Sequence, residues 1–186
     1  MPRIGFEELM LATIIPAALV ASWKDYREHR VPNWLNASIA LSGLAAQTAF
    51  NGWAGLESAL AGMLLAFGML VIFWAIKGMG AGDVKFMAAI GAWLGPHLTA
   101  NAVVVGGLAG GLLAVGIIVC RRRWGETFSN FRVLVAKVCN VHTAFSEFGS
   151  AKSLSGSTAL LPYAIPLSVG ALVVAVSNYS GWWKVL

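Results

Sequence analysis

Six apolar runs follow one another along this chain, and they limit its possible folds more than any other feature. Most of them approach the roughly 20 residues that a helix needs to cross the hydrocarbon core of a bilayer. The runs lie at about Phe6–Trp23, Trp34–Phe50, Leu56–Ile76, Val84–Leu94, Leu98–Val119 and Thr158–Val176. We therefore predict an all-α polytopic membrane protein with about six transmembrane helices, forming a single domain over residues 1–186.

The composition agrees with a lipid environment. Hydrophobic residues make up 58% of the 186 residues and charged residues only 11%, and the mean hydropathy is +0.74. A soluble domain carries about 25% charged residues, so this chain has more apolar surface than one small core can hide. The fourth run, Val84–Leu94, is short and is followed by Pro96, so a re-entrant or half-buried helix is the alternative there.

The basic residues gather on one side of the predicted topology. All Lys and Arg residues except Arg3 and Lys184 fall in the regions that follow the first, third and fifth runs. Cytoplasmic segments of membrane proteins carry an excess of Lys and Arg, so we expect these regions in the cytoplasm and both termini outside. The formal net charge of +5 is then a signal of topology, and nucleic-acid binding is not expected.

The only long polar stretch is the basic segment of residues 121–156. Apolar side chains recur in it every three to four residues, which is typical of an amphipathic helix lying on a membrane surface. A basic loop without regular structure is the alternative. Cys120 and Cys139 form no CxxC pair, and the histidines lie in separate segments, so neither a metal nor another cofactor is expected.

Two aspartates need an explanation that solvation does not give. Asp25 ends the first run and Asp83 opens the fourth, and the alternating topology brings both to the same membrane face. Carboxylates near the interface are costly unless they are paired or used. Two that lie close together cannot both ionise easily, so one keeps a proton. One can then act as a general base on water while the other donates a hydrogen bond to a carbonyl, as in aspartic proteases.

Other roles remain open for both residues. Asp83 precedes an apolar run and can cap a helix there, and Asp25 can pair with Lys24, Arg27 or Arg30. A small membrane transporter also places acids along its pathway.

Each aspartate belongs to a short motif. Gly80 and Gly82 precede Asp83, and they allow the backbone to adopt positive φ and to approach a bound peptide closely. Asp83 is followed by Val84 and Lys85. Asp25 is followed, after a basic loop, by Val31, Pro32 and Asn33. Pro32 ends the loop and Asn33 can cap the second helix, so this motif sets where that helix begins.

Together, the two motifs resemble those of the type IV prepilin peptidases, membrane proteases of the GxGD aspartic type. In length and order of spans the chain resembles their short TadV/CpaA-type form. The resemblance implies that Asp25 and Asp83 are catalytic and that Gly80, Gly82, Lys85, Pro32 and Asn33 support them. A third, weaker likeness is the segment Leu161–Pro166, which opens the sixth helix.

The resemblance also implies a function. The chain would be an aspartic endopeptidase of the inner membrane that removes the N-terminal leader from type IV (Flp/Tad-type) prepilins or pseudopilins at the cytoplasmic face. Its partners would be the precursor, with its leader peptide and the apolar helix that follows, and the lipid bilayer. Methyltransferase activity is not expected, because no CxxC pair occurs. An archaeal preflagellin-type peptidase shares both motifs. A transporter that uses Asp25 and Asp83, or a non-enzymatic assembly scaffold, are the alternatives from other classes.

The fifth run carries two pairs of glycines at small-xxx-small spacing, Gly106 with Gly110 and Gly107 with Gly111. Such pairs allow helices to approach closely. We expect them to be used for packing inside the bundle, and a homo-oligomer remains open.

Overall fold

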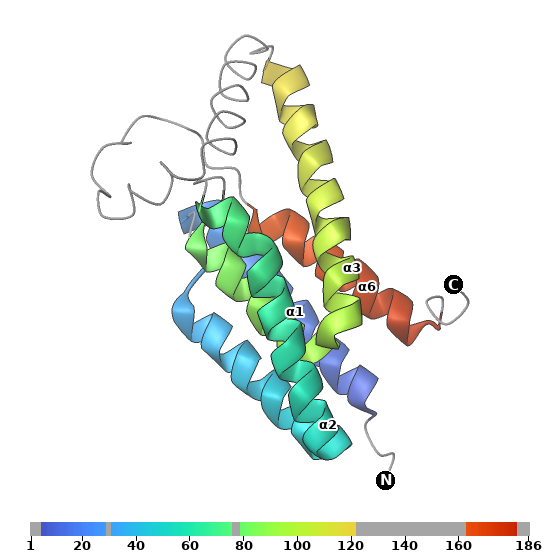
Figure 1. Ribbon diagram of the computed structural model, residues 1–186. Coiled ribbons are helices and arrows are strands. Elements are labelled where there is room, and N and C mark those ends of the chain that lie inside the picture. Colours follow the sequence, from blue (N-terminus) through green and yellow to red (C-terminus); the bar gives the residue numbers. More distant parts are fainter. Residues whose placement is uncertain (1–4, 29–30, 76–78, 122–162, 182–186) are drawn as a thin grey trace.

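The computed structural model describes residues 5–28, 31–75, 79–121 and 163–181, and in these ranges the chain is helical apart from short turns. The helices are α1 (Phe6–Glu28), α2 (Asn33–Ala75), α3 (Ala81–Arg121) and α6 (Ala164–Tyr179). They pack side by side as a bundle (Figure 1). Apart from Arg121, the amphipathic segment predicted at 121–156 lies outside the described residues.

Two glycines interrupt the long helices. Gly52 in α2 has φ 61° and ψ −140°, and Gly95 in α3 has φ 69° and ψ 176°, so each of these helices consists of two. The left-handed region is costly for residues with a Cβ and open to glycine. Pro96, directly after Gly95, also cannot continue the helical hydrogen bonds. The chain reverses direction at both glycines (Figure 1), and both breaks lie where the sequence predicts connections between runs.

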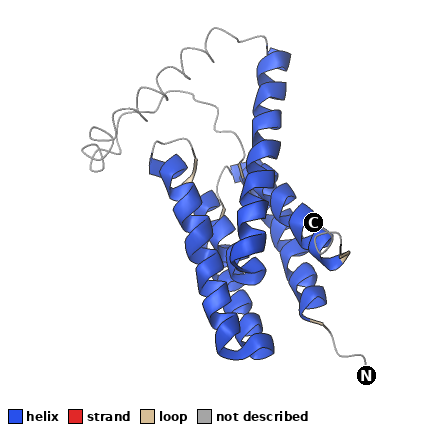
Figure 2. Cartoon of the chain, turned by 45° about the vertical axis from the view of Figure 1, so that its right-hand side comes forward, coloured by secondary structure: helices blue, strands red, loops and turns tan. Residues whose placement is uncertain are grey.

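The all-α prediction is confirmed, and the helices are those of a membrane protein. α1, α2 and residues Ala81–Gly116 of α3 are long and apolar enough to cross a membrane, and α6 is a shorter apolar helix. The second half of α3 extends past the other helices at one end of the bundle (Figure 2). The same end holds the C-terminus of α1 and the first residues of α3 and α6 (Figure 1).

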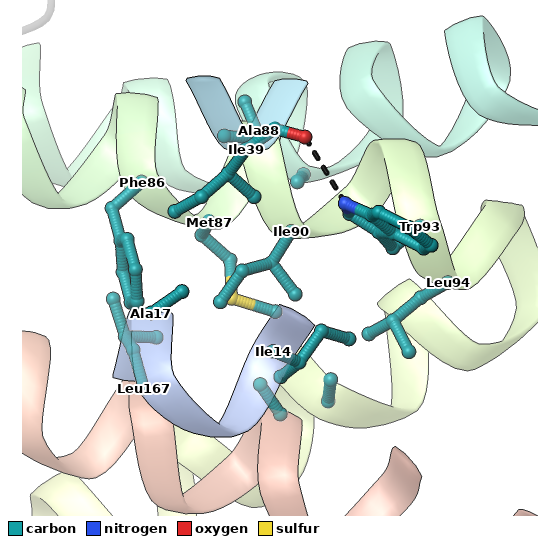
Figure 3. Packing of buried hydrophobic residues seen from close by; sticks show 14 of the residues in the cluster. Ile14, Ala17, Ile39, Phe86, Met87, Ala88, Ile90, Trp93, Leu94 and Leu167 are labelled. Atoms are coloured by element: carbon teal, nitrogen blue, oxygen red, sulfur yellow. Dashed lines mark hydrogen bonds between the residues drawn. The ribbon is translucent and has the colours of Figure 1, made fainter. Parts of the chain in front are cut away.

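The first half of α3 is the centre of the bundle. Between Val84 and Leu94 every side chain except that of Lys85 is buried, and those of Phe86, Met87 and Ile90 have no exposed surface. Figure 3 shows these residues packed against Ile14 and Ala17 of α1, Ile39 of α2 and Leu167 of α6. A helix that is apolar all round belongs in an interior. The short fourth run is therefore enclosed by protein rather than half-buried.

Polar side chains tie this central helix to α2 near its broken end. The Trp93 indole Nε1 donates a hydrogen bond of 3.1 Å to the Ile39 carbonyl, drawn in Figure 3. The Gln47 amide donates one of 3.1 Å to the Trp93 carbonyl. Carbonyls near a helix end lack partners within the helix, and Gln47 supplies one inside an apolar bundle.

Glycines allow the helices to cross in contact. A Cβ added at Gly62 of α2 would meet the carbonyl oxygen of Gly91 in α3, and one at Gly170 of α6 would meet the backbone of Ala102 and Gly106. Small residues at such crossings let two backbones approach closely. These two crossings clamp α3 between α2 and α6.

The two small-xxx-small pairs of α3 differ in use. Gly106 and Gly110 face α6, where Pro166 lies 3.4 Å from a Cβ added at Gly110. A Cβ added at Gly107 or Gly111 would meet no atom within 4 Å. One pair therefore packs inside the bundle and the other points away from it.

We expect Gly170→Ala to destabilise the bundle and Gly107→Ala to leave it unchanged or slightly stabilised. The methyl group at position 170 would press on backbone atoms that cannot rotate away, a strain of about 1–3 kcal/mol. At position 107 it meets no neighbour, and alanine is favoured over glycine in a helix by about 1 kcal/mol. Thermal unfolding of both variants in the same detergent measures the difference. Equal midpoints would contradict the crossing described here.

Candidate active site

The structure brings Asp25 and Asp83 together at one end of the bundle. Asp25 lies in the last turn of α1 and is 4% exposed, and Asp83 lies in the first turn of α3 and is 7% exposed. The charge of Asp25 acts directly on Asp83, so the two carboxylates are neighbours. Two buried carboxylates side by side are rare in a purely structural role, because each disfavours ionisation of the other.

Both carboxylates are held by backbone N–H groups at the start of a helix. Asp25 Oδ2 accepts a hydrogen bond of 3.0 Å from the N–H of Ala164, the first residue of α6. The Asp83 carboxylate accepts one from the backbone of Gly80, directly before α3. Helix N-termini have free N–H groups and a positive dipole end. Negative charge on either carboxylate is therefore stabilised by a backbone N–H group, that of Ala164 for Asp25 and that of Gly80 for Asp83.

The capping role considered for Asp83 holds only in modified form. The Gly80 carbonyl accepts hydrogen bonds from the N–H groups of Asp83 and Val84, so Gly80 occupies the cap position. Asp83 is the third residue of the helix, and its carboxylate reaches back to the backbone of Gly80, which directly precedes the helix. The third residue of a capping box makes the same contact. The Asp83 carboxylate therefore both closes the start of α3 and faces Asp25.

The two sequence motifs pack against each other. Gly82 lies on Val31, whose backbone N and O atoms would both be 3.4 Å from a Cβ added at Gly82. The Asn36 amide donates a hydrogen bond of 3.3 Å to the Gly82 carbonyl, and Lys85 Nζ donates one of 3.4 Å to Asn33 Oδ1. The start of α2 thus holds the connector that carries Asp83.

The prediction that Asn33 caps the second helix is wrong. The Pro32 carbonyl accepts hydrogen bonds from the N–H groups of Leu35 and Asn36, so Pro32 takes the cap position and Asn33 is already helical. A proline needs no partner for its missing N–H and fits well at a helix start. The Asn33 side chain is thereby free to accept the hydrogen bond from Lys85.

The basic residues considered as partners of Asp25 have other contacts. Lys24 forms a salt bridge of 2.8 Å with Glu28, and the Arg27 guanidinium lies 5.2 Å from the centre of the Trp23 ring. Arg30 lies outside the described residues. In the ranges that the structure describes, no three His, Cys, Asp or Glu side chains gather as a metal site would require.

Sequence reasoning did not assign three residues of this site. Tyr163 is half-buried, and the charge of Asp83 acts on its phenol. Ala164 supplies the N–H for Asp25, and Asn36 holds Gly82. The likeness at Leu161–Pro166 pointed to the first two. A lone amide one turn after Asn33 in an apolar run was the available signal for the third.

In its described residues the chain is an apolar helical bundle with two buried carboxylates at one end. These features place it among the membrane proteins that have a two-carboxylate site. The sequence profile of the type IV leader peptidase family matches residues 12–115, which include both aspartates. The chain belongs to this family.

Curated relatives carry the name prepilin leader peptidase/N-methyltransferase. One from Aeromonas hydrophila is 29% identical over 119 residues, which are 56% of this chain and 41% of the relative. One from Burkholderia pseudomallei is 31% identical over 113 residues, 57% of this chain and 36% of the relative. One from Pseudomonas aeruginosa is 31% identical over 116 residues, 59% and 39% of the two chains. The chain thus matches about 40% of these relatives' length. No solved structure matches it significantly.

We expect Asp25→Asn and Asp83→Asn each to raise the thermal stability of the protein. Either change replaces one of two neighbouring buried carboxyl groups, which disfavour each other's ionisation, by a neutral amide whose oxygen can still accept the backbone hydrogen bond. Functional sites are commonly built at the expense of stability, and a gain of about 1 kcal/mol raises the unfolding midpoint by ~2–4 °C in a chain of this size.

The matched control is Glu57→Gln, which removes an exposed carboxylate on α2. Thermal unfolding in detergent compares the three variants with wild type. A fall in the midpoint for both aspartate variants, with Glu57→Gln unchanged, would mean that the pair stabilises the bundle.

Proposed function

We propose that this chain is a membrane aspartic endopeptidase that removes the N-terminal leader from type IV prepilins or pseudopilins. Membership of the leader peptidase family supports the reaction class. The observation that carries the proposal is the meeting of Asp25 and Asp83, buried and next to each other, where α1, α3 and α6 come together. Residues 1–186 would act as a single catalytic domain.

The pair supplies what peptide hydrolysis requires. One ionised carboxylate takes a proton from a water molecule, whose oxygen attacks the scissile carbonyl carbon. The other carboxyl group, which holds the proton that the pair shares, donates a hydrogen bond to the carbonyl oxygen. The tetrahedral intermediate collapses when a proton reaches the leaving nitrogen and the C–N bond breaks. Because the aspartates titrate as a pair, these two roles belong to the pair.

The surrounding residues would hold the pair in place. Gly80 leaves room for the Asp83 carboxylate, because a Cβ there would lie 3.1 Å from Asp83 Oδ2. Gly82 packs against the Val31 backbone. The hydrogen bond from Lys85 to Asn33 connects α3 to the start of α2. Pro32 sets that start. We assign these five residues to positioning the catalytic pair rather than to the chemistry itself.

Aromatic side chains support a site at the level of a membrane interface. Trp23 and Tyr26, on either side of Asp25, are 62% and 70% exposed, and Trp34 nearby is 63% exposed. Trp53, at the other end of the first half of α2, is 72% exposed. At about 1.5 Å per residue the helix between Trp34 and Trp53 is about 28 Å long. Belts of Trp and Tyr mark the two interfaces, which lie about 30 Å apart.

The positions of the basic residues support a site on the cytoplasmic side of the inner membrane. Lys24 and Arg27 lie beside Asp25 near the end of α1, and Lys85 lies beside Asp83 at the start of α3. Basic residues accumulate on the cytoplasmic side of membrane proteins. We propose that the helices on either side of Gly52 and Gly95, together with α1 and α6, form six crossings. Precursors of the Flp/Tad type are the proposed substrates, on the resemblance of the motifs to the short peptidases.

We expect Asp25→Asn and Asp83→Asn each to slow leader removal by about 10²–10⁴-fold, the usual contribution of a general acid or base. The protein is co-expressed with a short prepilin, and cleavage is followed by gel shift and N-terminal sequencing. Membrane levels of all variants are matched first. Glu57→Gln serves as control and should cleave at the wild-type rate, because its carboxylate is exposed and lies close to the Gly52 break of α2, away from the aspartates.

The results separate the possible readings. Loss of cleavage in each aspartate variant alone supports the two-carboxylate mechanism. Cleavage at a near wild-type rate by either variant would show that the assignment of the pair is wrong, and solute flux would then be measured for a transporter. The mass of the cleaved product also shows whether it carries an N-methyl group, which we do not expect.

A further inference from the structure

A groove of about 350 Å³ opens beside the connector that carries Asp83. It is formed by both halves of α2 and the first half of α3. The lining residues are Asn33, Asn36, Ala37, Ala40, Met63, Phe67, Lys85, Ala88 and Ala89. One end of the groove is therefore polar and close to the catalytic pair, and the rest is apolar and lies farther along the helices.

One side chain of the groove has an unused hydrogen-bonding atom. Asn36 is only 6% exposed, and its Nδ2 is bonded to the Gly82 carbonyl. Its Oδ1 is buried and has no hydrogen-bond partner among the described residues. A buried acceptor without a partner costs free energy, and a donor brought by a ligand in the groove that Asn36 lines would remove that cost once the amide turns toward it.

The backbone N–H groups at the start of a helix are donors of the required kind. The first four N–H groups of any helix have no partner within it. In the proposed substrate class a long apolar helix follows the cleavage site, so the N–H groups next to the scissile bond would be donors that need acceptors. Asn36 holds the connector of Asp83 with one atom and can receive such a donor with another.

The apolar part of the groove fits the rest of that helix. Four of its lining residues are alanines, and small residues let a helix approach closely. Met63 and Phe67 of α2 add apolar surface farther from the polar end. The polarity runs in the right direction, because the polar end adjoins the aspartates and the apolar end extends along the bundle.

We propose that this groove binds the first turns of the precursor's apolar helix and that Asn36 Oδ1 accepts a backbone N–H from its first turn. The proposal rests on the function proposed above and names the part of the substrate that the site holds. Asn36 is a positioning and specificity residue in this account, and Lys85 with Asn33 forms the polar mouth of the groove.

A second groove provides the comparison. It lies between α1 and α2, has a volume of about 490 Å³, and includes Thr13, Trp34, Ser38 and Ser42 in its lining. It is larger, but neither of the two buried unpartnered atoms found in the described ranges, Asn36 Oδ1 and Thr99 Oγ1, belongs to its lining residues. Volume favours this groove, whereas hydrogen bonding favours the one at Asn36.

Site-specific photo-crosslinking distinguishes the two grooves. A benzophenone amino acid is placed at Phe67 in one groove or at Ser42 in the other, in an Asp25→Asn background that retains uncleaved precursor. We expect the precursor to crosslink from position 67, through residues of its apolar helix identified by mass spectrometry. Crosslinking from position 42 instead, or from neither position, would overturn the proposal.

A matched pair of variants tests the same groove in the active enzyme. Ala37→Leu fills the groove from an exposed position, and Ala61→Leu adds the same bulk at an exposed position of α2 that lines neither groove. We expect Ala37→Leu to lower kcat/KM by roughly tenfold or more, mainly through KM, because it removes binding rather than chemistry. Ala61→Leu should stay within about twofold of wild type.

These results can be told apart from failure of the proposed function. If wild type does not cleave the precursor while the protein is present in the membrane, the function itself is in doubt. If wild type cleaves and Ala37→Leu cleaves with unchanged KM, the peptidase assignment stands and the groove assignment falls.

Discussion

Inside a bilayer every backbone N–H and C=O must find a partner within the protein, and this constraint accounts for much of the architecture. The chain reverses direction at Gly52 and Gly95 with single-glycine breaks, which leave few backbone groups outside a helix. Where a break does leave a carbonyl, a side chain supplies the donor, as Gln47 does for Trp93. The unpaired N–H groups at helix starts are used as well, because two of them bind the carboxylates of Asp25 and Asp83.

The position of the acid pair follows from the same constraint. A carboxylate buried among apolar helices is costly, and free N–H groups at a helix N-terminus are the nearest compensation that a helical protein can offer. α3 and α6 both begin at the end of the bundle where α1 finishes (Figure 1). Asp25 can therefore reach the start of α6, and Asp83 the start of its own helix, while the two remain neighbours.

Local sequence signals predicted the positions of the helices well, and the contacts between helices less well. Apolar runs and Pro96 located the helices and one of the breaks, because both signals depend on residues close in sequence. The start of α2 was placed one residue too late, since either Pro32 or Asn33 can take the cap position and the structure uses Pro32. The use of Gly106 and Gly110 rather than Gly107 and Gly111 depends on the rotation of α3 against α6, which their identical spacing cannot specify.

In the candidate site, too, the sequence indicated some residues but not the contacts between helices. Asp25 and Asp83 could be selected from the sequence, because the alternating topology puts them on one face and both belong to motifs that resemble those of the type IV prepilin peptidases. The bond from Ala164 to Asp25 could not be predicted, because it joins residues from the first and last described helices. Asn36 was missed because its role comes from a contact with Gly82 on another helix.

The hydrogen bond between Ala164 and Asp25 also has a consequence for how the protein is made. Because a chain is synthesised from its N-terminus, α1, α2 and α3 are made before α6. Until α6 arrives, Asp25 lacks the N–H donor that α6 provides, and the N-terminal helices carry both aspartates in an unfinished setting. The order of the helices along the chain thus delays completion of the hydrogen bonding around Asp25 until α6 has joined the bundle.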